Sequence, residues 1–231
     1  MNILALETSS QYCSVALACR GEVQQRSDES KLSHSRQLLP LLSDLMASAS
    51  LGYGDLDCIA VSRGPGSFTG LRIGIAVAQG LGFASDLPVV PVSSLAQVAQ
   101  SAADCGMTGA VLATLDARMG ELYAGCYDLC VDGPKLLGGE QVLPPQQIDR
   151  LLAAEDQDVC RENLAAIVGG GLTYRNDFPD TWQALLQQCP RENLQPHAEV
   201  LLRLAASAFS RGEAVVAEVL TPVYLRNKVV S

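Results

Sequence analysis

One pattern in this sequence occurs twice, and it limits the fold more than any other feature. Residues 3–6 are apolar and end on Glu7, and residues 111–115 are mostly apolar and end on Asp116. In each case a second apolar run begins six residues after the acid and leads to a glycine turn. A strand with an acid at its end, a tight return and a second strand, repeated in this way, indicate two duplicated halves. The alternative is a chance match between two hairpins, since short strand patterns recur easily.

Hydrophobic spacing divides the chain into alternating strands and helices. Strands are predicted over 3–6, 13–18, 22–27, 56–61, 89–92 and 165–168, and helices over 33–49, 69–84, 94–103 and 197–210. The helices form crossovers long enough for parallel strand pairing, which places the chain in the α/β class. Residues 134–145 are predicted to form loops, and a short helix follows near 146–154. We expect an N-terminal half of residues 1–104 and a C-terminal half of residues 105–231.

Composition excludes several classes of protein. The 231 residues are 48% hydrophobic and 18% charged, which excludes a disordered or coiled-coil chain. The net charge of −9, with no basic run, argues against direct binding of nucleic acid, because phosphate affinity depends on cations. The sequence has no apolar stretch of about 18 residues and no export signal, so we expect a cytoplasmic protein without a membrane span. The eight cysteines are interpreted as free thiols, and their spacing predicts no metal site.

The glycine-rich segment 64–74 follows a predicted strand and opens a predicted helix. Free N–H groups at a helix start attract anions, so this position is typical of an anion or nucleotide site. The candidate residues for that site are Glu7, Gly64, Gly66, Ser67, Thr69 and Arg72. The segment has neither the ending of a P-loop nor the spacing of a dinucleotide fingerprint. A tight turn that only lets helix and strand approach explains the glycines equally well, and lone acids after strands are often turn residues.

Two predicted helices carry faces suited to packing against another helix. Leucines recur at three-to-four spacing over 33–49, and small residues recur every four positions over 69–84. Each helical glycine costs about 1 kcal/mol relative to alanine, so a row of them needs close backbone approach as its reason. We predict a partner-binding surface made of Leu38, Leu41, Leu42, Leu45, Gly70, Gly74 and Ala78. The alternative is that both faces pack against the chain's own sheet.

Four motifs in combination resemble the TsaB (YeaZ) family of bacteria, over essentially the full length of the chain. They are Ile3-Leu4-Ala5-Leu6-Glu7-Thr8-Ser9, His34-Ser35, the segment 64–74, and Asp116-Ala117-Arg118-Met119-Gly120-Glu121-Leu122-Tyr123. The resemblance implies an actin-like ATPase (ASKHA) fold of two related halves. It also implies a role in making N6-threonylcarbamoyladenosine (t6A) in tRNA, as the non-catalytic partner of the related protein TsaD. TsaE joins that complex, and TsaC supplies threonylcarbamoyl-adenylate.

One departure from the TsaD pattern supports the non-catalytic role. TsaD-like sequences carry two metal-binding histidines four residues apart, and Ser94 and Val98 occupy those places here. Valine has no lone pair for a metal, so a TsaD-type metal site cannot form. The resemblance therefore implies a scaffold and activator subunit that pairs with TsaD and TsaE. From the two apolar helix faces we expect a homodimer when the chain is alone, and from its acidity we expect contact with tRNA only through the complex. We expect no intrinsic cofactor, with ATP or ADP bound at the partner interface.

Two alternative functions are kept. A small ASKHA ATPase or phosphotransferase would use Glu7, Asp116 and the glycine turn 169–171 around a nucleotide. A glycoprotease-like peptidase has less support, because the chain has no GxSxG elbow and His34 is predicted to be a helix-start residue.

Overall fold

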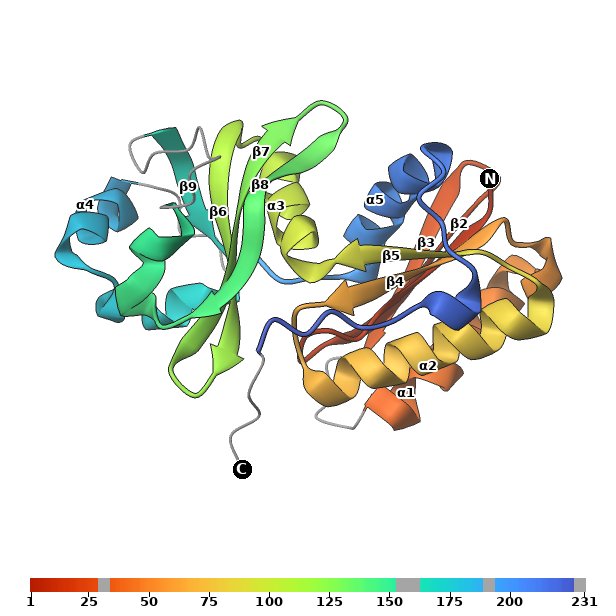
Figure 1. The fold of residues 1–231 in the computed structure, drawn as a ribbon. Helices are drawn as coiled ribbons and strands as arrows, with labels where there is room; N and C mark the ends of the chain where they lie inside the picture. The colour runs from red at the N-terminus through yellow and green to blue at the C-terminus, as the bar shows by residue number, and fades with distance from the viewer. Residues whose placement is uncertain (29–33, 153–162, 189–193, 227–231) are drawn as a thin grey trace. The chain divides into compact units, whose positions relative to one another are not determined.

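The computed structural model describes residues 1–28, 34–152, 163–188 and 194–226. Its contacts divide the chain into two compact units (Figure 1). The first comprises Met1–Ser94 and Pro196–Val223, and the second comprises Leu95–Gln195 and Tyr224–Ser231.

The first unit is built on a five-stranded sheet in the order β3-β2-β1-β4-β5. Its strands are β1 (Ile3–Glu7), β2 (Cys13–Cys19), β3 (Glu22–Asp28), β4 (Cys58–Gly64) and β5 (Val89–Ser93). Its helices are α1 (His34–Ala49), η1 (Tyr53–Asp55), α2 (Phe68–Ser85), α5 (Ala198–Ser210) and η5 (Ala217–Val219). β1 runs antiparallel to β2 and parallel to β4, and β4 runs parallel to β5, which confirms the predicted crossovers.

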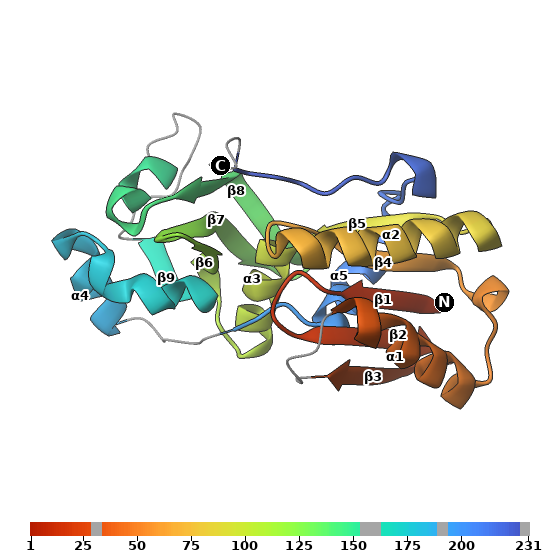
Figure 2. The same cartoon turned by 90° about the horizontal axis from the view of Figure 1, so that it is seen from below.

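Helices cover both faces of this sheet. Leu4 and Leu6 of β1 belong to the core under α1 and α2, whereas Ile3 and Ala5 belong to the core under α5. Figure 2 shows α1 and α2 side by side over one face. Burial on both faces explains why β1 is an unbroken apolar run and does not alternate with polar residues.

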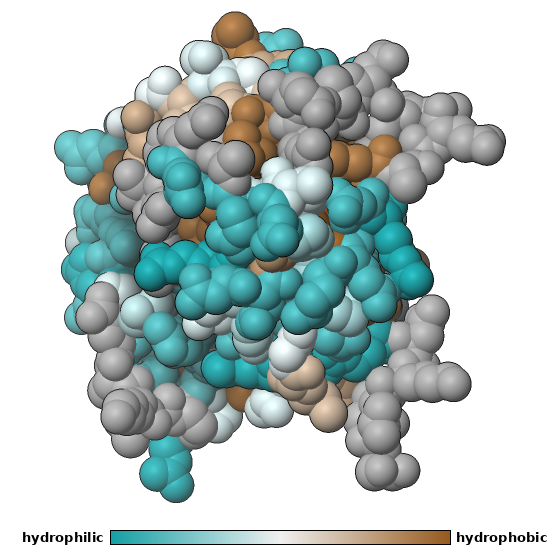
Figure 3. Space-filling view, turned by 90° about the vertical axis from the view of Figure 1, so that its left-hand side faces the viewer, coloured by the Kyte–Doolittle hydropathy of each residue, from teal (hydrophilic) through white to brown (hydrophobic). Residues whose placement is uncertain are grey.

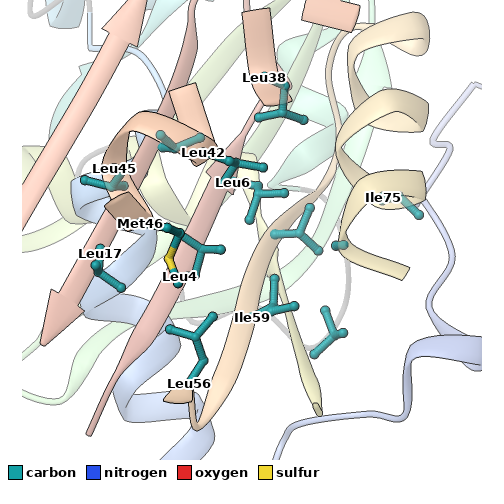
Figure 4. Packing of buried hydrophobic residues seen from close by; sticks show 14 of the residues in the cluster. Leu4, Leu6, Leu17, Leu38, Leu42, Leu45, Met46, Leu56, Ile59 and Ile75 are labelled. Carbon is teal, nitrogen blue, oxygen red and sulfur yellow. The ribbon is translucent and has the colours of Figure 1, made fainter. Parts of the chain in front are cut away.

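The leucine side of α1 supplies much of the first core. Leu38, Leu42 and Leu45 are at most 1% exposed and point toward the leucines of β1 and β2 (Figure 4). Pro40 lies inside α1, which begins at His34, and is on the exposed side of the helix.

The second unit has a four-stranded sheet in the order β8-β7-β6-β9. Its strands are β6 (Gly109–Arg118), β7 (Glu121–Cys130), β8 (Gly133–Leu143) and β9 (Leu164–Val168). Its helices are α3 (Ser94–Asp104), η2 (Pro145–Leu151), η4 (Gly170–Asp177) and α4 (Asp180–Gln188). Val111 and Ala113 of β6 pack with residues of α3, whereas Leu112 shares a core with Trp182 of α4. The side of this unit that carries α4 is mostly hydrophilic, with scattered apolar residues (Figure 3).

Four strands of the first sheet have the same order and directions as the four strands of the second. β6 runs antiparallel to β7 and parallel to β9, as β1 runs antiparallel to β2 and parallel to β4. This correspondence confirms the predicted duplication. Within the described residues, no helix combines the length and the apolar character that a membrane span requires.

Two details differ from the sequence-based expectations. The units do not follow the expected halves 1–104 and 105–231, because α3 packs in the second unit and α5 packs in the first. The expected loop over 134–145 is wrong, because Gly133–Leu143 is the edge strand β8. Its pairing with β7 shifts register near Gly138 and Gly139, which explains why its glycines obscured the strand pattern.

Candidate functional site

The end of β1 carries a buried carboxylate. Glu7 is fully buried, and its Oε1 accepts a hydrogen bond of 2.6 Å from the backbone N–H of Ser9. Its Oε2 accepts a hydrogen bond from the hydroxyl of Ser62, near the end of β4. Both carboxylate oxygens are therefore engaged within the chain, and Glu7 ties the β1–β2 turn to β4.

The glycine-rich segment rests directly on this turn. The backbone N–H of Ser67 donates to the carbonyl oxygen of Ser9 at 2.7 Å. A Cβ at Gly66 would lie 2.4 Å from that same carbonyl oxygen, and a Cβ at Gly70 would lie 2.0 Å from the carbonyl oxygen of Thr8. The hydroxyl of Thr8 donates back to the carbonyl of Gly70 at 2.8 Å. These glycines therefore allow close contact between backbones, which supports the conformational interpretation of the motif.

The remaining anion candidates lie at the start of α2. Ser67 is its N-cap, and the Ser67 hydroxyl accepts a hydrogen bond from the N–H of Gly70 at 3.2 Å. Thr69 and Arg72 are exposed, and the Arg72 guanidinium lies 3.7 Å from the ring centroid of Phe68. Of the six predicted residues, only Ser67, Thr69 and Arg72 have exposed side chains, and Gly64, with φ 104°, is buried. Binding of an anion or nucleotide by this chain stays a prediction.

Most of the predicted partner-binding residues face the chain's own core. Besides the three buried leucines of α1, the residues Gly70, Gly74 and Ala78 lie on the inner face of α2. A Cβ at Gly74 would lie 2.3 Å from Oγ1 of Thr8, and Ala78 is fully buried. Helix-to-sheet packing explains the small-residue spacing, and these six residues lie inside the chain's own core, so their contact with a partner stays a prediction. Leu41 is half-buried, and its contact with a partner stays a prediction.

The exposed residues on the outward faces of α1 and α2 were not among the predicted partner-binding residues. On α2 they comprise Phe68, Arg72, Ala76, Gly80, Phe83 and Ala84, and on α1 they include Leu39. Phe83 is 75% exposed and Leu39 is 55% exposed. A Cβ at Gly80 would meet nothing within 4 Å. The signal was present in the sequence as a second row of small residues at 76, 80 and 84, but spacing alone does not say which row faces inward.

In the second unit, Asp116 organises the β6–β7 hairpin. Its Oδ1 accepts hydrogen bonds from the N–H of Arg118 at 2.7 Å and from the hydroxyl of Tyr174 at 2.9 Å. Its Oδ2 lies 3.1 Å from the Arg118 guanidinium. Burial raises the pKa of Tyr174, and the hydrogen bond to Asp116 raises it further. Asp116 thus lies near the end of β6, opposite Leu122, and its contacts are those of a residue that stabilises the hairpin turn.

The glycine turn 169–171 also packs against protein. A Cβ at Gly169 would lie 2.1 Å from the carbonyl oxygen of Thr114 and 2.9 Å from Cγ1 of Val98. Val98, at one of the places where TsaD-like sequences carry histidine, is fully buried in the apolar core under α3. Ser94, at the other place, is also fully buried.

Comparison with known proteins gives consistent matches over nearly the whole chain. A family model described as TsaD, tRNA N6-adenosine threonylcarbamoyltransferase, matches residues 28–230. The chain is 35% identical to the tRNA threonylcarbamoyladenosine biosynthesis protein TsaB of Escherichia coli K12, covering 99% of this chain and 96% of that protein. It is 32% identical to TsaB of Haemophilus influenzae, covering 99% and 95%.

A solved structure agrees with these relatives. YeaZ from Pseudomonas aeruginosa superposes with a TM-score of 0.82 at 40% sequence identity, covering 97% of this chain and 99% of that one. The mixed α/β architecture with two related sheets is the ASKHA-like fold that the sequence resemblance implied. The chain therefore belongs to the TsaB (YeaZ) family of tRNA threonylcarbamoyladenosine biosynthesis proteins.

Proposed function

We propose that this chain is a non-catalytic scaffold and activator subunit in t6A biosynthesis, and that it pairs with a TsaD-type catalytic subunit through the outward face of α1 and α2. The observation that carries the proposal is exposed Phe83 beside the outer row of small residues on α2, together with exposed Leu39 on the neighbouring helix α1. Exposed large apolar side chains beside small residues are a packing surface that the chain itself leaves uncovered.

The geometry of α2 suits a helix partner. Ala76, Gly80 and Ala84 recur every four residues on the exposed side. A ridge from another helix fits between such rows, and small residues allow the two axes to approach closely. Gly80 would be the point of closest approach, because nothing in the chain lies within 4 Å of a Cβ at this position.

The non-catalytic character is supported by α3. Metal ligands need a lone pair and access to the ion, and Val98 has no lone pair and lies inside an apolar core. Ser94 alone would be a single weak ligand. Restoring a TsaD-type metal site would thus require both new side chains and a new cavity.

The other parts of the proposal concern the remaining members of the complex. TsaE joins the complex, ATP or ADP binds at the partner interface, and tRNA is bound through the complex because this chain carries a net charge of −9. When the chain is alone, the same apolar face pairs two copies. The homodimer and the complex with a TsaD-type partner then exclude each other, because both use this face.

The test is a reconstitution with purified TsaD, TsaE, TsaC, threonine, bicarbonate, ATP and unmodified tRNA, with and without this chain. We expect t6A to form only when the chain is present, and no turnover by the chain alone. Equal product without the chain would contradict the scaffold role and favour the phosphotransferase alternative. Peptide cleavage by the pure chain would instead favour a peptidase.

A second measurement tests the surface. Gly80→Leu should abolish co-elution with TsaD on a sizing column and leave the melting temperature nearly unchanged, because the added side chain meets open space. Gly139→Leu is the matched control, since Gly139 is also exposed with nothing within 4 Å of its Cβ position but lies on β8 of the second unit. Unchanged co-elution of the Gly80 variant would locate the interface elsewhere.

A further inference from the structure

A short segment near the C-terminus lies against the end of α2 (Figure 1). It begins at Val215, which pairs with Val89 at the outer edge of β5 through two backbone hydrogen bonds of 2.8 Å. At its other end, the side-chain amide of Gln79 on α2 donates to the carbonyl oxygen of Leu220 at 3.0 Å. We call residues 215–220, which include η5, the C-terminal strap.

The C-terminal strap is apolar on both of its sides. In a 3-10 helix, side chains three residues apart lie on the same side. Ala217 and Leu220 are buried in the first core, and a Cβ at Gly82 would lie 3.0 Å from the Cβ of Ala217. Val216 and Val219, which flank this inner pair, are each 61% exposed. The strap therefore turns one apolar pair toward α2 and a second apolar pair away from the core.

The outer pair continues the exposed side of α2. Gly82 contacts the strap, and Phe83, the next residue of the helix, is 75% exposed. Successive side chains on an α-helix are about 100° apart, so Phe83 emerges next to the strap on the outward face. Phe83, Val216 and Val219 thus form one apolar patch from two segments that are far apart in the sequence. An exposed patch of this kind marks an interaction surface.

The charges around the patch favour one kind of partner. Asp86, which caps the C-terminal end of α2, and Glu218 of η5 are both exposed. Neither carboxylate forms an ion pair with any residue that the structure describes. A second copy would bring the same carboxylates and a net charge of −9, and like charges oppose association. A catalytic subunit that binds tRNA needs cations for the phosphates, so its surface suits this acidic rim better.

We propose that the C-terminal strap belongs to the partner surface and selects a TsaD-type subunit over a second copy of this chain. Val216 and Val219 pack against apolar side chains of that subunit, and Asp86 and Glu218 pair with its lysine or arginine residues at the rim. The inference rests on the proposed function, because it takes the partner from that complex. An apolar centre with a polar rim is typical of protein interfaces, and repulsion of the wrong partner adds specificity.

The first experiment removes the outer apolar pair. The full-length chain with Val216→Ser and Val219→Ser is titrated against purified TsaD, and its self-association is measured by sedimentation velocity. We expect binding to TsaD to weaken about tenfold or more, with self-association and melting temperature nearly unchanged. Val23→Ser is the matched control, because Val23 is 54% exposed on β3, at the opposite edge of the sheet from β5. The control should bind TsaD as the wild type does.

The second experiment removes the rim charges and keeps the apolar patch. Asp86→Asn with Glu218→Gln should weaken binding to TsaD several-fold and reduce its dependence on salt, because charge pairs are lost. The same variant should self-associate at least as well as the wild type, because like charges are removed. Asparagine also tolerates the left-handed backbone of Asp86, which has a φ of 53°.

The outcomes separate two kinds of failure. If the wild-type chain does not bind TsaD and does not raise t6A formation, the proposed function fails and the inference falls with it. If the wild type binds TsaD, Gly80→Leu abolishes that binding and the double serine variant binds as tightly as the wild type, the strap inference alone is overturned. Weaker self-association of the serine variant with unchanged binding to TsaD would also overturn it, because the occupant would then be a second copy.

Discussion

Both units pack a buried threonine against a glycine that follows the parallel neighbouring strand, and we call this threonine–glycine contact the joint, although Thr8 comes directly after β1 whereas Thr114 lies inside β6. In the first unit, Thr8 donates to the carbonyl of Gly70 at 2.8 Å, and Gly74 packs against the Thr8 side chain. In the second, Thr114 donates to the carbonyl of Val168 at 2.8 Å, and Gly171 packs against Thr114. The Thr8 hydroxyl thus bonds the helix α2, whereas the Thr114 hydroxyl bonds the neighbouring strand β9, and in both units a glycine packs closely against the threonine.

The two units differ in the element that comes after this joint. The first unit continues as α2, an 18-residue helix with an exposed apolar side, whereas the second continues as the short irregular helix η4. A long helix provides a regular outer face on which apolar side chains line up, and a short 3-10 segment provides none. The two units therefore share a threonine–glycine joint and differ in their outer surface, and the proposed partner surface lies on the unit with the long helix.

The largest expected loss of stability comes from replacing the glycine of each threonine–glycine joint. Gly74→Ala places a Cβ 2.3 Å from Oγ1 of Thr8, and Gly171→Ala places one 2.6 Å from Cβ of Thr114. Each change should lower the free energy of unfolding by about 2–3 kcal/mol through overpacking. Adding Thr8→Ala should restore part of the loss, because it deletes the clashing oxygen. Adding Thr114→Ala should restore less, because it removes the contact with Oγ1 at 2.8 Å but leaves the closer contact with Cβ of residue 114 at 2.6 Å.

Urea unfolding followed by circular dichroism measures these four variants and the two threonine single variants that complete the cycles. Equal rescue in both units, or rescue in neither, would show that the two joints do not differ as their contact atoms indicate.

A smaller loss of stability tests whether the threonine hydroxyl contributes equally in the two units. Thr8→Val and Thr114→Val each remove one buried hydroxyl and keep the side-chain volume, so each should cost about 1–2 kcal/mol. Thr8→Ser and Thr114→Ser keep the hydroxyl and are the controls. Hydrogen exchange of amides in each unit locates the loss, and the single tryptophan, Trp182, reports the second unit by fluorescence. A loss confined to one of the two valine variants would break the equivalence.

The smallest effect concerns the thiols. Burial raises the pKa of Cys13 and Cys58 in the first unit, and of Cys126 in the second, to about 12 in each case. Cys105 and Cys130, both in the second unit, are exposed. Near pH 8 we therefore expect iodoacetamide to modify Cys105 and Cys130 and to spare the three buried thiols, because the thiolate is the reactive form. Peptide mapping by mass spectrometry reads out each site.

Asp128 refines this prediction. The thiol of Cys130 donates to Asp128 at 3.3 Å, and this hydrogen bond raises the pKa of Cys130. Asp128→Asn should lower that pKa, increase the thiolate fraction at a given pH, and speed alkylation of Cys130 a few-fold relative to Cys105. A slower or unchanged rate would show that the carboxylate does not control this thiol.

The positions of strands and helices along the chain could be predicted from the sequence better than the side of each helix that faces the core. Apolar runs and helical spacing located nearly every strand and helix of the first unit, because both faces of its sheet are buried. The same spacing could not show which side of α2 faces inward, since two rows of small residues alternate on it. Only the contact of Gly74 with Thr8 decides between them.

Long-range contacts set the other limits. The edge strand β8 was hidden because Pro134 and the glycines 138 and 139 disrupt its pattern, and an edge strand tolerates such residues. The pairing of Glu7 with Ser62 joins residues 55 positions apart, which no local pattern predicts. Arg226 is likewise far in sequence from the hairpin that it holds, and its role is evident only from its contacts with Ala117 and Glu121.

The position of α5 along the chain has a consequence for synthesis. The helix covers one face of the first sheet, yet it comes after the second unit in the sequence. As the chain leaves the ribosome, the five strands are complete long before α5 appears, and the side of the sheet that carries Ile3, Ala5 and Ala16 stays bare. An apolar face of this kind attracts other unfolded chains or a chaperone. The yield of this protein in a cell therefore depends on how well the nascent sheet is protected until its last helix is made.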